Sequence, residues 1–160
     1  MSLGLGITGG VHGQLLIDQS TPVAGAGGGR DAGGYLLIDG GRWWSGALGF
    51  LRQTVPAQGR NVVYFFVEPR ARLVTLARPA GARVDAGVSL RLARGNADGA
   101  LVNDPGMVAP GAFITVHLAT HAGNHGLSLL LGTYYAALSN THHTPQSHTT
   151  GAQVALEWLP

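Results

Sequence analysis

Residues 88–94 read VSLRLAR, and the type of side chain changes at every position of this stretch. The apolar residues Val88, Leu90 and Leu92 alternate with smaller or more polar residues, among which Arg91 carries a charge. Successive side chains of a β-strand point to opposite faces, so this period of two predicts a strand. We expect its apolar face to be buried, and the face that carries Arg91 to meet water or a partner.

Most of the remaining chain has the same character. Its apolar segments are rich in β-branched, aromatic and leucine residues, and each ends at a glycine, proline or asparagine turn signal. No segment keeps a helical period with caps at both ends, although SGALGFLRQ around Leu48 is a candidate for a short helical turn. Weaker strands are expected near Gln14–Asp18 and Tyr35–Asp39, which share the letters LLID. The strong predicted strands are Asn61–Pro69, Arg72–Arg78, Val88–Arg94, Ala112–Thr120, Leu127–Leu138 and Gln153–Leu159.

These strands predict an all-β protein, either an antiparallel β-sandwich or a barrel, because no helices separate them. About eight strands fit a jelly roll, which is the fold that we expect. The chain of 160 residues is read as one domain, 1–160. Residues 1–34 are so rich in glycine that they are expected to form a partly extended arm, in which short extended pieces are joined by flexible chain.

Composition narrows the possible functions. There are no cysteines, which excludes disulfides and thiolate chemistry. Charged residues make up 11% of the chain against about 25% in an average soluble domain. The net charge of +2 and the scattered arginines make a nucleic-acid partner unexpected. No apolar run reaches the roughly 18 residues of a membrane helix, and the N-terminus lacks the pattern of a signal peptide, so membrane insertion is not expected.

Three of the seven histidines are spaced four residues apart, in the segment HLATHAGNH from residue 117 to 125. His117, His121 and His125 are therefore candidate metal ligands under either strand or helix geometry. The alternative is that they line the rim of a strand and the loop that follows. Asp and Glu are absent between Pro105 and Leu156, and this absence argues against a hydrolytic metal site.

The stretch GAFITVH, Gly111 to His117, resembles the beginning of the first cupin motif, which is carried on a jelly roll. The resemblance implies a cupin-like metal protein. The match departs from that motif at Ala119, where a second histidine would stand, and the following glutamate is missing.

Two further groups are candidate contact residues. Trp43 and Trp44 are adjacent, so in an extended segment one of them would face outward to anchor an interface or stack on a sugar. Arg70 and Arg72 lie on one side of a predicted strand start, as interface donors often do. His142, His143 and His148 lie in a polar loop that would be solvated or make contacts.

No catalytic motif accompanies these residues. The chain lacks a Gly-x-Ser-x-Gly elbow and has no lysine for a P-loop, so we expect neither an enzyme nor a cofactor. The strand pattern of Tyr35 to Pro160 resembles the single jelly-roll capsid and capsid-decoration proteins of bacterial viruses. That resemblance implies a virion shell component with itself and other shell proteins as partners. The alternative is a carbohydrate- or surface-binding module of a fibre or adhesin at the cell surface, and a cupin-like protein is the third possibility.

Overall fold

The computed structural model of this chain is built entirely of β-strands in the part that it describes, residues 1–17, 25–55, 60–77, 82–97, 106–119, 126–139 and 146–160. Within these ranges no helix is long and apolar enough to cross a bilayer. The strands are β1 (Ser2–Ile17), β2 (Gly25–Asp39), β3 (Trp44–Val55), β4 (Arg60–Ala77), β5 (Arg83–Ala97), β6 (Gly106–Ala119), β7 (Gly126–Ser139) and β8 (Gln146–Leu159).

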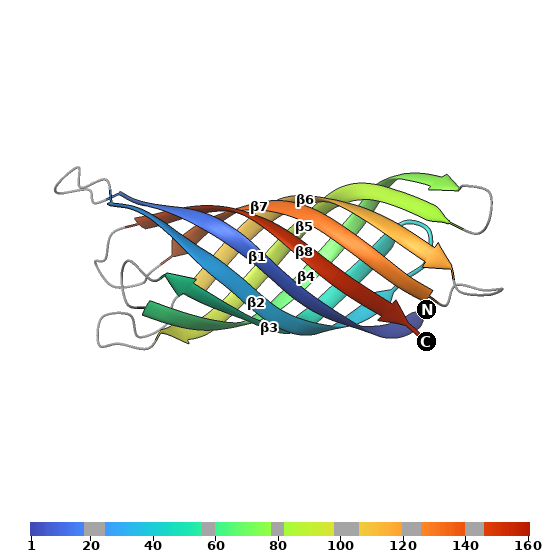
Figure 1. Cartoon of the computed structure of the whole chain (residues 1–160), viewed down its shortest axis with the longest axis horizontal. Helices are drawn as coiled ribbons and strands as arrows, with labels where there is room; N and C mark the ends of the chain where they lie inside the picture. The colour runs from blue at the N-terminus through green and yellow to red at the C-terminus, as the bar shows by residue number, and fades with distance from the viewer. Residues whose placement is uncertain (18–24, 56–59, 78–81, 98–105, 120–125, 140–145) are drawn as a thin grey trace.

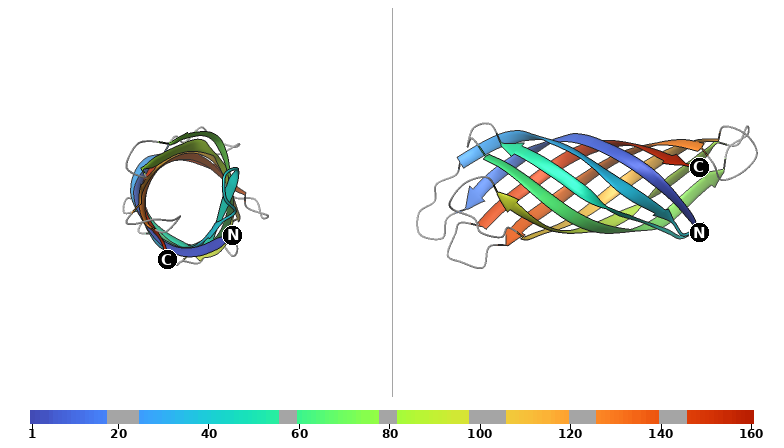
Figure 2. Two further views of the ribbon diagram at one scale, coloured as in Figure 1. Left: turned by 90° about the vertical axis from the view of Figure 1, so that its right-hand side faces the viewer. Right: turned by 90° about the horizontal axis from the view of Figure 1, so that it is seen from below.

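The eight strands form one closed antiparallel barrel (Figure 1). Each strand pairs with the next along the chain, and the ring closes where Leu5 of β1 pairs with Trp158 of β8. Figure 2 shows the ring end-on, with both termini at the same end of the barrel. Closure leaves no strand with an unpaired edge. We call the end that holds the termini the terminal end, and the other the distal end.

The closed barrel shows that the predicted jelly roll is wrong. A jelly roll stacks two sheets face to face, whereas here a single sheet closes on itself with strands in sequence order. The prediction of an all-β fold with about eight strands holds. Neighbouring strands of this chain pair by simple hairpins, and the turn signals that predicted the strands do not distinguish hairpins from the crossing connections of a jelly roll.

The predicted N-terminal arm is also wrong in the part that the structure describes, because residues 2–17 form β1 and residues 25–34 belong to β2. Several glycines there leave room for large side chains inside the barrel. Gly6 pairs with Tyr35 of β2, and a Cβ atom added at Gly6 would lie 2.2 Å from the Tyr35 ring. Gly151 of β8 leaves similar room for Tyr134 of β7. Glycine in these strands thus serves a close approach between neighbouring side chains.

Two local predictions are corrected as well. The residues around Leu48, a candidate helical turn, lie in the middle of β3. The predicted strands 61–69 and 72–78 are one continuous strand, β4, which contains a β-bulge between Arg72 and Val74. The bulge breaks the alternation expected for this stretch, since the side chains from Leu73 to Leu76 are all exposed.

Candidate functional site: outer wall and lumen

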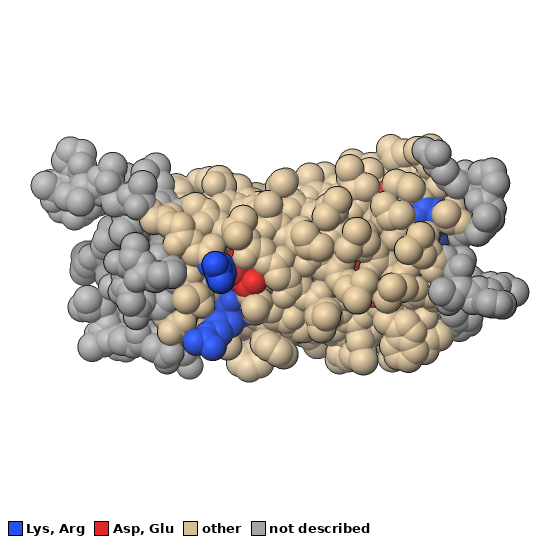
Figure 3. Space-filling view, viewed as in Figure 1, with Lys and Arg blue, Asp and Glu red and all other residues tan. Residues whose placement is uncertain are grey.

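The outer wall of the barrel is apolar. Every strand carries leucine, isoleucine, valine or aromatic side chains at some of the alternate positions that point outward. Phe65 is 71% exposed, although burial of such a side chain away from water is strongly favourable. Figure 3 shows two groups of charged atoms towards the two ends, with a wide uncharged surface between them. Examples from the eight strands are Ile7, Leu36, Phe50, Phe65, Leu92, Ile114, Leu131 and Val154.

All three tryptophans of the chain gather at the terminal end and are exposed. Trp43 and Trp44 stand where β3 begins, and the carbonyl oxygen of Trp43 accepts a hydrogen bond from the amide of Arg72. Trp158 lies one residue before the end of β8. The guanidinium of Arg42 lies 4.7 Å from the centre of the Trp43 ring. Tryptophan side chains favour the boundary between an apolar medium and water, because the ring is apolar and its N–H is polar.

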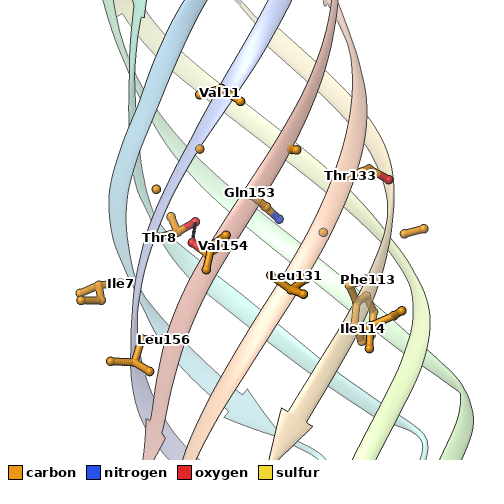
Figure 4. A pocket seen from close by; sticks show the side chains of 15 residues that line it. Ile7, Thr8, Val11, Phe113, Ile114, Leu131, Thr133, Gln153, Val154 and Leu156 are labelled. Atoms are coloured by element: carbon orange, nitrogen blue, oxygen red, sulfur yellow. Dashed lines mark hydrogen bonds between the residues drawn. The ribbon is translucent and has the colours of Figure 1, made fainter.

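A broad hollow of about 1000 Å³ interrupts the outer wall across β1, β6, β7 and β8 (Figure 4). Its floor is a row of small residues, Ala112, Thr133 and Ala152, which pair with one another across β6, β7 and β8. Leu131 and Val154 form one side of the hollow. The hollow is lined mainly by apolar groups, so it continues the apolar character of the outer wall.

The lumen is charged and filled. In its middle, Arg70 of β4 contacts Glu68 at 2.8 Å and Glu157 of β8 at 2.5 Å. Arg91 of β5 contacts the other oxygen of Glu68 at 2.5 Å, and Tyr35 donates a 2.7 Å hydrogen bond to Glu157. Because the charges compensate one another and accept or donate hydrogen bonds, they are tolerated away from water.

Hydrogen bonds also cross the lumen between distant strands. Arg91 of β5 donates to the side-chain oxygen of Gln153 on β8 at 2.8 Å. Gln53 of β3 donates to the hydroxyl of Tyr134 on β7, which in turn donates to Asp31 of β2. The second carboxylate oxygen of Asp31 lies 2.7 Å from Nδ1 of His12. These bridges, together with buried rings such as Phe66, occupy the space that a water-filled pore would need.

A second polar cluster closes the lumen towards the terminal end. Asp85 is fully buried and contacts both Arg72 at 3.2 Å and His117 at 2.8 Å. Nδ1 of His117 lies 2.6 Å from Oγ of Ser128, and Arg72 also contacts Asp39 at 2.9 Å. Asp85, His117 and Ser128 have the order of a hydrolase triad. Ser128, however, is only 3% exposed, and Asp85 is shared with two arginines, so the contacts join strands and leave no nucleophile open.

The predicted site residues are spread over the barrel. His117 lies in β6 with its side chain in the terminal cluster, whereas His121 and His125 lie outside the described residues, as do His142 and His143. No group of three potential metal ligands occurs among the residues that are described. Trp43 and Trp44 are exposed on the outside. Arg70 and Arg72, expected at an interface between subunits, lie inside the lumen.

Sequence reasoning missed the acidic partners of these arginines. Every acidic side chain in the described ranges is buried: Asp31, Asp39, Glu68, Asp85 and Glu157. Four of them, Asp31, Glu68, Asp85 and Glu157, lie within a strand at a position that points into the lumen, and Asp39 is the last residue of β2. A signal was present in β8, where Glu157 stands between Leu156 and Trp158, because a charge flanked by large apolar residues marks two faces of opposite character.

Comparison with known proteins adds little to this description. No protein-family model matches the chain, and no curated protein matches its sequence. Among solved structures, the crystal structure of Neisserial surface protein A is similar, with 13% sequence identity and a TM-score of 0.49 over 95% of this chain and 96% of that chain. The strand pairing described above, rather than this similarity, defines the fold.

Proposed function

We propose that this chain is an integral membrane protein of the β-barrel type, located in a bacterial outer membrane with its outer wall in contact with lipid. The observation that carries the proposal is the reversed polarity of the barrel: apolar side chains face outward on all eight strands while the charged side chains of the middle point into the lumen. This arrangement exposes apolar surface to water in a soluble protein, but it matches a lipid bilayer.

Three further features support a membrane location. The strands contain 12 to 18 residues, which exceeds the roughly 9–11 residues that a tilted strand needs to cross the hydrocarbon. In the closed ring every strand has a neighbour on both sides, so its backbone N–H and C=O groups can form hydrogen bonds within the sheet. A protein surrounded by lipid requires this. An even number of antiparallel strands is typical of bacterial outer-membrane barrels. Location at the cell surface, the alternative considered from the sequence, fits this proposal.

The proposal replaces the virion shell component and the expectation of no membrane insertion. The capsid interpretation depended on a jelly roll, which the closed barrel excludes. The cupin interpretation depended on the same fold.

We further propose that the barrel is a scaffold at the membrane and neither an open pore nor an enzyme. The ion pair between Arg70 and Glu157 and the hydrogen bond from Gln53 to Tyr134 join strands from opposite sides of the lumen. Diffusion of a solute would require these contacts to break. We assign no chemical step to the cluster of Asp85, His117 and Ser128, because its serine is buried.

Flotation with lipid vesicles tests the membrane location. Urea-denatured chain is diluted into phosphatidylcholine vesicles, which are then floated through a density gradient and washed with carbonate. We expect the chain to float with the vesicles, to resist the wash and to show the circular dichroism of β-structure. A folded chain that stays at the bottom of the gradient would refute the proposal.

Release of a trapped dye tests the closed lumen in the same vesicles. We expect vesicles that carry the barrel to retain carboxyfluorescein as well as empty vesicles do. Steady release in proportion to the amount of inserted barrel would show an open pore and refute the scaffold proposal alone.

A further inference from the structure

Two arginines stand next to each other on the outside of the barrel. Arg30 of β2 and Arg52 of β3 are both exposed and point outward. Arg30 pairs with Thr54, and Ala32 pairs with Arg52, so the two arginines are diagonal neighbours on one face of adjacent strands. Diagonal neighbours in an antiparallel pair lie about 7–8 Å apart, within reach of side chains as long as arginine.

Neither arginine has a counter-ion in the described part of the chain. No ion pair or hydrogen bond joins Arg30 or Arg52 to any described residue. The acidic residue nearest in sequence to Arg30 is Asp31, whose two oxygens are occupied by His12 and Tyr134 inside the lumen. Two like charges side by side repel each other, so an anion from outside the chain would stabilise the pair.

The position of the pair suggests where that anion is. Along β3, Arg52 follows the outward apolar residues Leu48 and Phe50 and lies three residues before the strand ends. The two arginines therefore lie at the border between the apolar outer wall and the distal end. Figure 3 shows a group of blue atoms towards the end away from the termini, with a few red atoms beside them and the mostly uncharged middle of the barrel beyond. The two widest sequence separations between consecutive strands, from Ile17 to Gly25 and from Ala97 to Gly106, also follow strands that end at the distal end. Longer connections are typical of the outward-facing side of outer-membrane barrels.

We propose that Arg30 and Arg52 together bind the phosphate of an anionic lipid headgroup at the outer border of the bilayer. A guanidinium group donates two parallel hydrogen bonds to phosphate oxygens, and two adjacent groups can hold one phosphate from two sides. The strands fix both arginines, so less freedom is lost on binding than on a mobile loop. The identification of the phosphate as a lipid headgroup rests on the proposed membrane location.

Calorimetric titration of the folded barrel in maltoside detergent tests the site. The ligands are dihexanoyl phosphatidic acid, dihexanoyl phosphatidylcholine and inorganic phosphate. We expect saturable binding of phosphatidic acid, and at least tenfold weaker binding of both phosphatidylcholine and free phosphate. Each basic residue near an anionic lipid surface contributes about fivefold in affinity, so the double variant Arg30→Gln/Arg52→Gln should bind about 25-fold more weakly.

Arg42→Gln is the matched control, because Arg42 is also exposed but lies at the terminal end. We expect it to bind phosphatidic acid within twofold of the unaltered chain. Equal affinity of the double variant and the control would overturn the proposal. Free phosphate that binds as tightly as phosphatidic acid would show a small-anion site and overturn the lipid assignment.

The titration does not require a bilayer, so its result is separable from that of flotation. Vesicle insertion without selective phosphatidic acid binding would remove only the lipid site. Binding of phosphatidic acid by a barrel that fails to float would leave a phosphate site on a protein outside the membrane, and would remove the membrane location.

Discussion

Nη1 of Arg70 lies 2.5 Å from Oε1 of Glu157, and the two residues are on opposite strands of the ring. β4 and β8 are separated by three strands in each direction around the barrel, so this ion pair spans the lumen. Both side chains are almost fully buried. The contact therefore ties together parts of the wall that no backbone hydrogen bond joins.

Loss of this bridge should destabilise the barrel. Arg70→Ala leaves the carboxylate of Glu157 with only the hydroxyl of Tyr35 among its described partners. Removal of one member of a buried ion pair costs about 3–5 kcal/mol of unfolding free energy. Urea unfolding in phosphatidylcholine vesicles, followed by tryptophan fluorescence, measures this cost. The exposed Arg42→Ala control should change stability by no more than about 0.5 kcal/mol. Equal costs for the two variants would contradict a bridged lumen.

The glycines of β1 differ in what they leave room for. At Gly6 an added methyl group would lie 2.2 Å from the Tyr35 ring, whereas at Gly9 it would meet only the carbonyl oxygen of Asp31 at 3.7 Å. Gly6→Ala should therefore cost about 1–3 kcal/mol through overpacking. Gly9→Ala should be neutral, or stabilise by up to about 1 kcal/mol by restricting the unfolded chain. The same urea titration compares the two variants, and a Gly6 variant as stable as the Gly9 variant would argue against this packing.

A charged side chain on the outer wall should lower the unfolding free energy in lipid, and the loss should be larger the closer the charge lies to the middle of the bilayer. Leu131 lies near the middle of β7, whereas Leu3 lies near the terminal end of β1, and both are exposed. Leu131→Arg should lower the unfolding free energy in vesicles by about 2–4 kcal/mol, and Leu3→Arg by about 0–1 kcal/mol. In a soluble protein either change would add charge to a surface that meets water. A Leu131→Arg variant that keeps full stability in vesicles would count against contact with lipid.

The tryptophans should report the depth of the terminal end. Trp43, Trp44 and Trp158 are all exposed there, so they should lie at the level of the lipid headgroups. Lipids brominated next to the headgroup should quench their fluorescence more than lipids brominated near the chain ends. Trp158→Phe should reduce the total emission without changing this order. Stronger quenching from the chain ends would place the terminal end in the hydrocarbon instead.

The sequence predicts the strands of this fold better than it predicts which side of each strand is buried. Alternation in residues 88–94 correctly indicated a strand. Its outward face, however, holds Val88, Leu90 and Leu92, while Arg91 is buried in the lumen. A period of two is the same for a barrel that is apolar inside and for one that is apolar outside. The two cases are distinguished by the partners of Arg91 inside the barrel, which are Glu68 of β4 and Gln153 of β8.

The glycine-rich start misled the prediction for a different reason. Glycine lowers the tendency of an isolated segment to form a strand, but in β1 the loss is offset by pairing on both sides, with β2 and with β8. The sequence also does not predict the polar cluster near the terminal end. The spacing of His117 to His121 and His125 points to a metal site, yet its partners Asp85 and Ser128 lie on neighbouring strands. Those contacts depend on how β5, β6 and β7 are aligned with one another, and the spacing of the histidines along the chain does not indicate that alignment.

The most direct test of an outward-facing apolar wall is a nitroxide scan of β7. The chain has no cysteine, so single cysteines can be placed and spin-labelled at each position from Leu127 to Tyr135. In vesicles, the accessibility of each label to oxygen, which dissolves in lipid, is measured by electron paramagnetic resonance. We predict a period of two, with maxima at Leu127, Leu129, Leu131, Thr133 and Tyr135. Maxima at the intervening positions, or equal accessibility along the strand, would contradict the account.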